Sequence, residues 1–209
     1  MPPADFSHVE FLLKRLRLPF LLEHFPPKLV WAAYVSINGF VSVALLAFLA
    51  EITGSPFVFP SLGPTAFLFF FSPLAEVSSP RSAILGHAIG LVCGYGAFWI
   101  TGMHDFSHAS AAGIDWPRIL AAALAISATG AFMVLLSVNH PPAGATTLIV
   151  ALGILSKPPY LPVIEAAVIL LTVQAWVFNR LAGLPYPMWG SAAPATSRPN
   201  TSRTYDPPR

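Results

Sequence analysis

The stretch Ser137–Gly153, SVNHPPAGATTLIVALG, places a histidine and two adjacent prolines inside a long apolar region of the chain. Pro141 and Pro142 each lack an amide donor and clash with the preceding turn, so a helix does not continue through them. The residues from Gly144 onward are mostly apolar again, which indicates a short helix that begins directly after the prolines. His140 therefore lies at a break in the backbone, and the flanking segments decide where that break is.

The composition is typical of a membrane protein. Hydrophobic residues make up 55% of the 209 residues and charged residues only 10%, whereas soluble domains carry about 25% charged residues. The length fits one domain. The single cysteine, Cys93, excludes an intramolecular disulfide and a metal site built from several cysteines. We expect neither a metal site nor a cofactor.

Four apolar segments are long enough to cross a bilayer, which takes roughly 20 helical residues. These segments are 28–52, 82–101, 116–138 and 161–183. Two further apolar pieces, 63–76 and 144–155, are too short to cross as helices alone. We therefore predict an all-α membrane protein with four full transmembrane helices and two short, broken helices.

The two short pieces occupy equivalent places in the chain. Each follows a full span, begins with a Pro/Gly break, ends in a link that contains proline and precedes another full span. This order predicts two structural repeats, 28–101 and 116–183, within a transmembrane domain at 28–183. Residues 1–27 are expected to form a basic amphipathic cytoplasmic segment, with a plain solvated lead-in as the alternative, and residues 184–209 a disordered cytoplasmic tail.

Charge orients these segments across the membrane. Basic residues gather before the first span and after the last one, so the positive-inside rule places both termini in the cytoplasm. We expect a multi-pass protein of the cell (inner) membrane. The loop 102–115 carries two aspartates and neither lysine nor arginine, so we expect it outside. Each half then crosses three times, and the halves are inverted repeats. The alternative topology has four crossings, with both short pieces re-entrant and this loop inside.

Paired broken helices in the two halves of a membrane protein indicate a transport site. A helix that begins in the membrane presents unpaired amides and the positive end of its dipole, which together attract an anion. We expect two such N-termini, at Gly63 and at Gly144, where glycine permits close approach of the backbone. The other candidate ligands at the two breaks are Ser61, Thr65, His140, Pro141, Pro142, Thr146 and Thr147. The alternative is that His140 and the prolines only shape a tight turn at the membrane surface.

Three further polar residues lie within or beside the predicted spans. Asn38 falls in the middle of the first span and should face protein or a cavity, where it is a further candidate ligand. His87, in the second span, either contributes to the site or hydrogen-bonds a neighbouring helix. Arg81 precedes that span and either attracts an anion to the cytoplasmic mouth or anchors the helix at the interface.

The run Asn139–Ala145, NHPPAGA, resembles the signature of the HPP family of integral membrane proteins. The first half resembles the same family at Ser61–Gly63, Ser72–Leu74, Pro80–Arg81 and Gly86–His87. The resemblance covers about residues 28–183. Family members in photosynthetic organelles and cyanobacteria are associated with nitrite transport, so the resemblance implies a transporter or channel for a small inorganic anion, with nitrite first.

Two other classes of function stay open. A scaffold or assembly subunit would use the flat face formed by Gly86, Gly90 and Gly94, and a homo-oligomer would form through the same face. A membrane enzyme would need reactive groups, and the sequence contains no motif of a zinc protease, a serine hydrolase or a P-loop ATPase. We therefore expect no enzyme and no nucleic-acid partner, and name the small anion and the lipid bilayer as partners.

Overall fold

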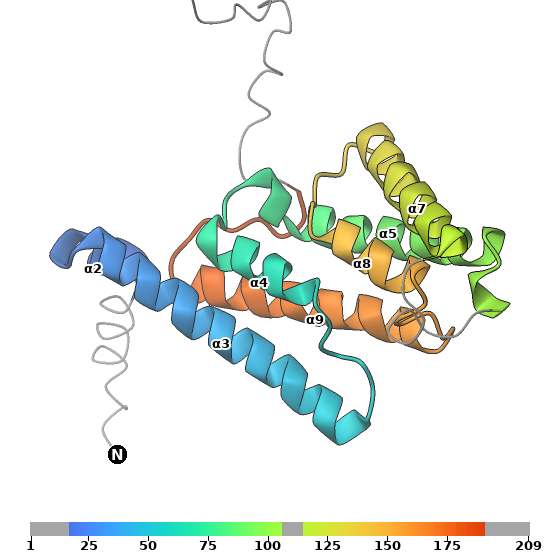
Figure 1. The fold of residues 1–209 in the computed structure, drawn as a ribbon. Coiled ribbons are helices and arrows are strands. Elements are labelled where there is room, and N and C mark those ends of the chain that lie inside the picture. Colours follow the sequence, from blue (N-terminus) through green and yellow to red (C-terminus); the bar gives the residue numbers. More distant parts are fainter. Residues whose placement is uncertain (1–16, 106–114, 191–209) are drawn as a thin grey trace, which may run out of the picture.

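The computed structural model describes residues 17–105 and 115–190, and within these ranges the chain is helical without any strand (Figure 1). The α-helices are α2 (Leu18–His24), α3 (Pro27–Thr53), α4 (Leu62–Phe71), α5 (Pro80–Ile100), α7 (Trp116–Leu135), α8 (Ala143–Ala151) and α9 (Tyr160–Leu181). Two 3₁₀ turns, η1 (Glu76–Ser78) and η2 (Met103–Asp105), follow α4 and α5. Most of the predicted N-terminal segment and tail, and the middle of the loop 102–115, lie outside the described residues.

Four of these helices, α3, α5, α7 and α9, are long and apolar enough to cross a membrane. The two helices at the predicted breaks are short, with 10 residues in α4 and 9 in α8. The expected all-α fold with four full spans and two short helices is therefore confirmed.

Prolines and caps set where the helices begin. Helices α3, α5 and α7 each carry a proline within their first two positions, where the missing amide donor costs nothing. The side chain of Ser79 accepts a hydrogen bond from the Ser82 amide at the start of α5, and Asp115 accepts one from the Arg118 amide at the start of α7. Helix α3 ends at Gly54, whose φ of 60° is a left-handed conformation that glycine adopts without strain.

The helices of the two halves pack in the same pattern. Each short helix contacts the first long helix of its own half and the last long helix of the other half: α4 packs on α3 and α9, and α8 packs on α7 and α5. Helices α5 and α9 pack against each other at the centre. In Figure 1, α3, α5 and α8 run from left to right, whereas α4 and α9 run from right to left.

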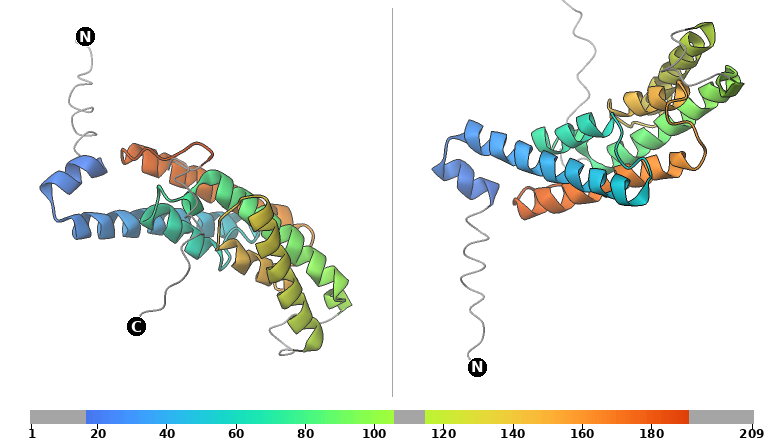
Figure 2. Two further views of the ribbon diagram at one scale, coloured as in Figure 1. Left: turned by 90° about the horizontal axis from the view of Figure 1, so that it is seen from above. Right: turned by 60° about the horizontal axis from the view of Figure 1, so that its bottom comes forward.

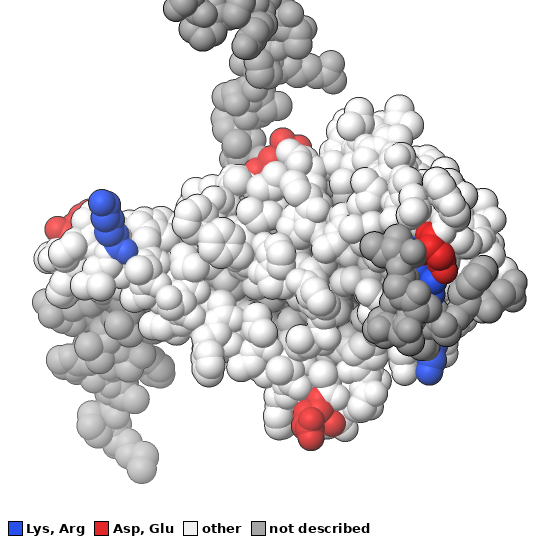
Figure 3. Space-filling view, viewed as in Figure 1, with Lys and Arg blue, Asp and Glu red and all other residues white. Residues whose placement is uncertain are grey.

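The outer faces of the long helices are apolar. Only Ser42 and Leu46 of α3 are buried, whereas Phe40 and Ile52 are 75% and 60% exposed. Figure 3 shows few charged side chains, which lie towards the periphery of an otherwise uncharged face. Exposed apolar surface of this extent indicates contact with lipid.

The start of the described chain and the end of α9 lie at the same end of the bundle. Helix α2 lies beside the C-terminal end of α9, where the Leu18 amide donates to the Ala182 carbonyl at 2.9 Å, whereas α7 lies towards the opposite end (Figure 2). The described residues continue past the predicted end of the transmembrane domain at residue 183. Tyr186 is fully buried and its hydroxyl donates to the Ser78 carbonyl, so the chain packs against the helices at this residue.

Candidate functional site

Five polar side chains meet in the protein interior where the two breaks come together. They are Ser61, Thr65, His87, His140 and Thr146, and none of them is more than 1% exposed. We refer to them as the histidine cluster. The cluster draws on α4, α5 and α8 and on the turn that precedes α8, so it contains residues from both halves of the chain.

The N-terminal turns of the two short helices touch through hydroxyl groups. Ser61 is the N-cap of α4, and Thr146 lies in the first turn of α8. Their side-chain oxygens are 2.6 Å apart, which is a hydrogen bond. The N-termini of the two short helices therefore meet, and they do so through side chains.

His87 of α5 joins this pair to Thr65. Its Nδ1 lies 2.7 Å from the Thr146 hydroxyl, and its Nε2 lies 3.0 Å from the Thr65 hydroxyl. The helix therefore presents both ring nitrogens to hydroxyl groups of α4 and α8. Of the two interpretations of His87, a bond to neighbouring helices is confirmed, and the same bonds place it in the cluster.

His140 lies at the break itself and closes the cluster on the other side of Thr65. Its Nε2 lies 3.2 Å from the Thr65 hydroxyl, and its Nδ1 lies 2.7 Å from the Val77 carbonyl oxygen. The ring also stands near Phe69, with centroids 6.4 Å apart. The histidine is fully buried, so the break is part of the packed interior of the protein.

The prolines form the turn from which α8 starts. Pro142 is buried and is the N-cap of α8, whereas Pro141 is exposed. The carbonyls of His140, Pro141 and Pro142 accept hydrogen bonds from the amides of Ala143, Gly144 and Ala145. The expectation of unpaired amides at the start of α8 is therefore wrong for this conformation, because the turn satisfies them locally.

Glycines of α5 allow the break to approach closely. A Cβ atom at Gly86 would lie 2.8 Å from the His140 Cβ, and one at Gly90 would lie 2.9 Å from the Ala143 carbonyl oxygen. One at Gly94 would lie 2.6 Å from the Thr147 carbonyl oxygen. The face of these glycines is covered by α8 and by the turn before it, so the suggested homo-oligomer through this face is wrong.

The two glycines expected at the helix N-termini do not line the cluster. Gly63 is exposed, and a Cβ atom added there would meet nothing within 4 Å. A Cβ atom at Gly144 would have Ile126 as its nearest neighbour, at 3.7 Å. Neither position therefore requires a glycine for close approach to the cluster in this conformation.

Two other predicted residues, Thr147 and Asn38, lie outside the cluster. The Thr147 hydroxyl bonds the Ala143 carbonyl and the Thr129 hydroxyl of α7, each at 3.0 Å, and so faces away from the histidines. Asn38 donates to the Tyr34 carbonyl of its own helix and lines a surface pocket between α2 and α3. The structure does not bring Asn38 into the site.

Arg81 contacts the end of α7. Its guanidinium donates to the carbonyl oxygens of Ser137 at 2.9 Å and Leu136 at 3.0 Å. Leu136 is the C-cap of α7, and Ser137 is the residue after it, so Arg81 satisfies carbonyls at the C-terminal end of the helix. Arg81 thus makes an anchoring contact close to the break. That it attracts an anion to the cytoplasmic mouth of the transport path stays a prediction.

Sequence reasoning missed a second buried polar contact, at Asn179 of α9. Its Oδ1 accepts a hydrogen bond from the Tyr34 hydroxyl at 2.7 Å, and its Nδ2 donates to the Phe69 carbonyl at 3.1 Å. The side chain therefore ties α3 and α4 to α9. An asparagine within an apolar span was the available signal for such a contact.

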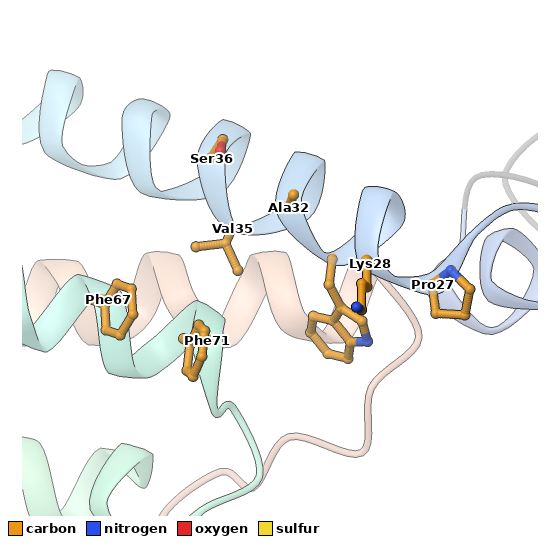
Figure 4. A pocket seen from close by; sticks show the side chains of 8 residues that line it. Pro27, Lys28, Ala32, Val35, Ser36, Phe67 and Phe71 are labelled. Atoms are coloured by element: carbon orange, nitrogen blue, oxygen red, sulfur yellow. The ribbon is translucent and has the colours of Figure 1, made fainter.

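The groove of Figure 4 is a different feature from the histidine cluster. It lies between α3 and α4, has a volume of about 620 Å³ and is walled mainly by apolar side chains, among them Val35, Phe67 and Phe71. Trp31 and Lys28 lie at the N-terminal end of α3 in the same groove. The groove opens on the apolar outer surface, and none of the cluster residues lines it.

The chemistry of the cluster is that of hydrogen bonding without fixed charge. Hydroxyl and imidazole groups donate and accept hydrogen bonds. Within the described residues, no three His, Cys, Asp or Glu side chains gather where they would hold a metal ion.

A comparison with curated proteins and one with solved structures each give no match. The family described as "HPP, transmembrane region" matches residues 25–187. The chain therefore belongs to the HPP family of integral membrane proteins.

Proposed function

We propose that the protein is a membrane transporter or channel for a small inorganic anion, with nitrite as the first substrate to test, and that it is not an enzyme. The observation that carries this proposal is the 2.6 Å contact between Ser61 and Thr146. It joins the first turns of two broken helices inside a membrane protein, and such paired breaks are typical of transport sites.

The cluster offers what a small anion requires. Hydroxyl groups donate hydrogen bonds, and the first turns of α4 and α8 add the positive ends of two helix dipoles. No aspartate or glutamate belongs to the cluster, so no fixed negative charge there opposes an anion. In the present conformation the donors bind one another, and an anion takes the place of the Ser61–Thr146 contact when α4 and α8 separate.

The packing supports a mechanism in which the two halves move relative to each other. Each short helix contacts long helices of both halves, so relative movement of the halves changes the surroundings of both N-termini together. We propose that the halves are inverted repeats with both termini in the cytoplasm, and that rocking of one half against the other opens the cluster alternately to the two sides.

The test is solute flux in proteoliposomes that contain only the purified chain. Wild-type protein is expected to move nitrite faster than protein-free vesicles do. Thr146→Val is expected to raise the half-saturation concentration about tenfold or more, because a hydrogen bond to a charged group contributes about 1.5–3 kcal/mol.

A matched control is Thr172→Val. Like Thr146, Thr172 is buried, but it lies in the long helix α9 and outside the cluster. Its hydroxyl bonds only the Val168 carbonyl one turn earlier, at 2.8 Å. This variant is expected to transport like the wild type. Absence of flux for nitrite and for a panel of other small anions, in correctly inserted protein, would favour a scaffold or an enzyme.

A further inference from the structure

The hydroxyl of Thr65 has more neighbours than it has hydrogens to donate. Within hydrogen-bond distance lie the Ser61 carbonyl oxygen at 2.9 Å, His87 Nε2 at 3.0 Å and His140 Nε2 at 3.2 Å. A hydroxyl supplies one hydrogen and two lone pairs. The protonation of the two rings therefore decides which of these contacts are hydrogen bonds.

The outer contact of His140 fixes one of its two nitrogens. Its Nδ1 faces the Val77 carbonyl oxygen at 2.7 Å, and a carbonyl only accepts, so Nδ1 carries a hydrogen. In the neutral ring Nε2 is then a bare acceptor. The Ser61 carbonyl and His140 Nε2 both need the single hydrogen of Thr65, and one of these contacts lacks a hydrogen.

One added proton removes this conflict. With a hydrogen on Nε2, His140 donates to Thr65, and Thr65 donates to the Ser61 carbonyl. His87 donates from Nε2 to the second lone pair of Thr65. Its Nδ1 accepts from Thr146, which in turn accepts from the Ser61 hydroxyl, so each contact has one donor and one acceptor.

We propose that the histidine cluster binds one proton, on Nε2 of His140 with Thr65 as its acceptor, and that this proton crosses the membrane together with the anion. The inference rests on the proposed transport function and adds a second transported species to it. The proton comes from water on one side, binds the ring lone pair and leaves to water on the other side. An O–H bond of hydronium breaks as this N–H bond forms, and the reverse exchange releases the proton on the other side.

The surroundings of His140 contain little other charge. Helix α5 contributes His87 and Arg81, whose guanidinium lies on the Ser137 carbonyl, and η1 contributes the exposed Glu76 beside Val77. Helices α4 and α8 carry no titratable side chain, and the nearest part of α7 carries none. An anion in the cluster therefore finds its counter-charge in the protonated imidazole, and the two bind in a mutually strengthening way.

The first experiment measures anion accumulation in proteoliposomes with the membrane potential clamped at zero. With one proton per anion, a gradient of one pH unit, acid outside, supports up to about tenfold accumulation inside. Nitrous acid crosses lipid unaided, so for nitrite only the initial rate of uptake above that of protein-free vesicles is counted. Nitrate is measured in parallel. Thr65→Val is expected to abolish the response of uptake to the pH gradient. Thr65→Ser keeps the hydroxyl and is expected to retain that response.

The second experiment reads the proton directly. The full chain, with His8, His24, His104 and His108 replaced by glutamine and ¹⁵N-labelled histidine at the two cluster positions, is titrated in lipid nanodiscs by NMR from about pH 8 to about pH 4, around the ordinary range of histidine. One proton per chain is expected to bind at His140. Sodium nitrite is expected to raise the pH of half-protonation by one unit or more, a tenfold gain in proton affinity, whereas sodium chloride at equal concentration serves as the salt control.

The outcomes separate the two proposals. Anion flux that ignores the pH gradient, or cluster rings that stay neutral throughout with nitrite present, would overturn the proton site while leaving anion transport intact. Proton binding in a chain that moves no anion in any assay would overturn the transport function, and the coupling with it.

Discussion

The imidazole rings of His87 and His140 lie 5.0 Å apart between centroids, although they belong to different halves of the chain. The Thr65 hydroxyl connects them through their Nε2 atoms. A single residue of the first short helix thus joins a spanning helix to the break before the second short helix. This relationship makes the cluster sensitive to any movement between α4, α5 and α8.

Replacement of His140 tests whether the break is more than a turn. His140→Ala removes a ring that bonds Val77 and Thr65 and is expected to abolish anion uptake. Expression and membrane insertion are expected to persist. They are checked by the amount of protein in the membrane fraction and by gel filtration in detergent. Normal flux in this variant would reduce His140 to a former of the turn.

The glycine face of α5 is expected to be intolerant of methyl groups. Gly94→Ala places a Cβ atom 2.6 Å from a backbone oxygen of α8, and such overpacking destabilises by about 1–3 kcal/mol. Thermal unfolding in detergent is the measurement. Gly96→Ala in the same helix is the control, because a Cβ atom there meets nothing within 4 Å. Equal melting temperatures for the two variants would contradict the packing of α5 on α8.

Asn179 is expected to stabilise the contact of α3 and α4 with α9. Asn179→Leu removes bonds to Tyr34 and Phe69 and leaves their buried polar groups unpaired, at a cost of about 1–3 kcal/mol in the free energy of unfolding. Asn38→Leu is the matched control, since its side chain donates only to its own helix. The prediction fails if both substitutions change the unfolding midpoint alike.

Arg81 is expected to act on the end of α7. Arg81→Met keeps much of the apolar stem but loses two hydrogen bonds to carbonyls, and net losses of about 0.5–1.5 kcal/mol per bond are typical. A lower unfolding temperature is therefore expected. An increased half-saturation concentration at unchanged stability would instead support a role in attracting the anion.

Cysteine labelling distinguishes the two topologies. In a Cys93→Ala background, Glu51→Cys at the end of α3 is outside in both, and it is expected to react with an impermeant thiol reagent in intact cells. Glu76→Cys is outside in the four-crossing topology and inside in the six-crossing one, so we expect no labelling. Both positions are exposed. Labelling at Glu76→Cys would support the four-crossing topology and contradict the proposal of inverted repeats.

The sequence alone determined the elements of this protein, because each depends on neighbouring residues. Apolar length identified the four spans, and prolines with glycines marked the two breaks, including the start of α8 after Pro142. Ser61, Thr65, His140 and Thr146 were found in the same way, since they flank those breaks. A local signal suffices wherever the chain must interrupt a helix.

Only the tertiary structure decided which side chains meet, because that depends on packing between segments far apart in the chain. It placed His87 against Thr146, covered the glycines of α5 with α8, and left Gly63 exposed. It also kept Asn38 out of the cluster and brought in Asn179 as a separate tie between helices. An apolar span looks alike on all its faces in the sequence, and only contact with the other helices determines which polar group turns inward and finds a hydrogen-bond partner.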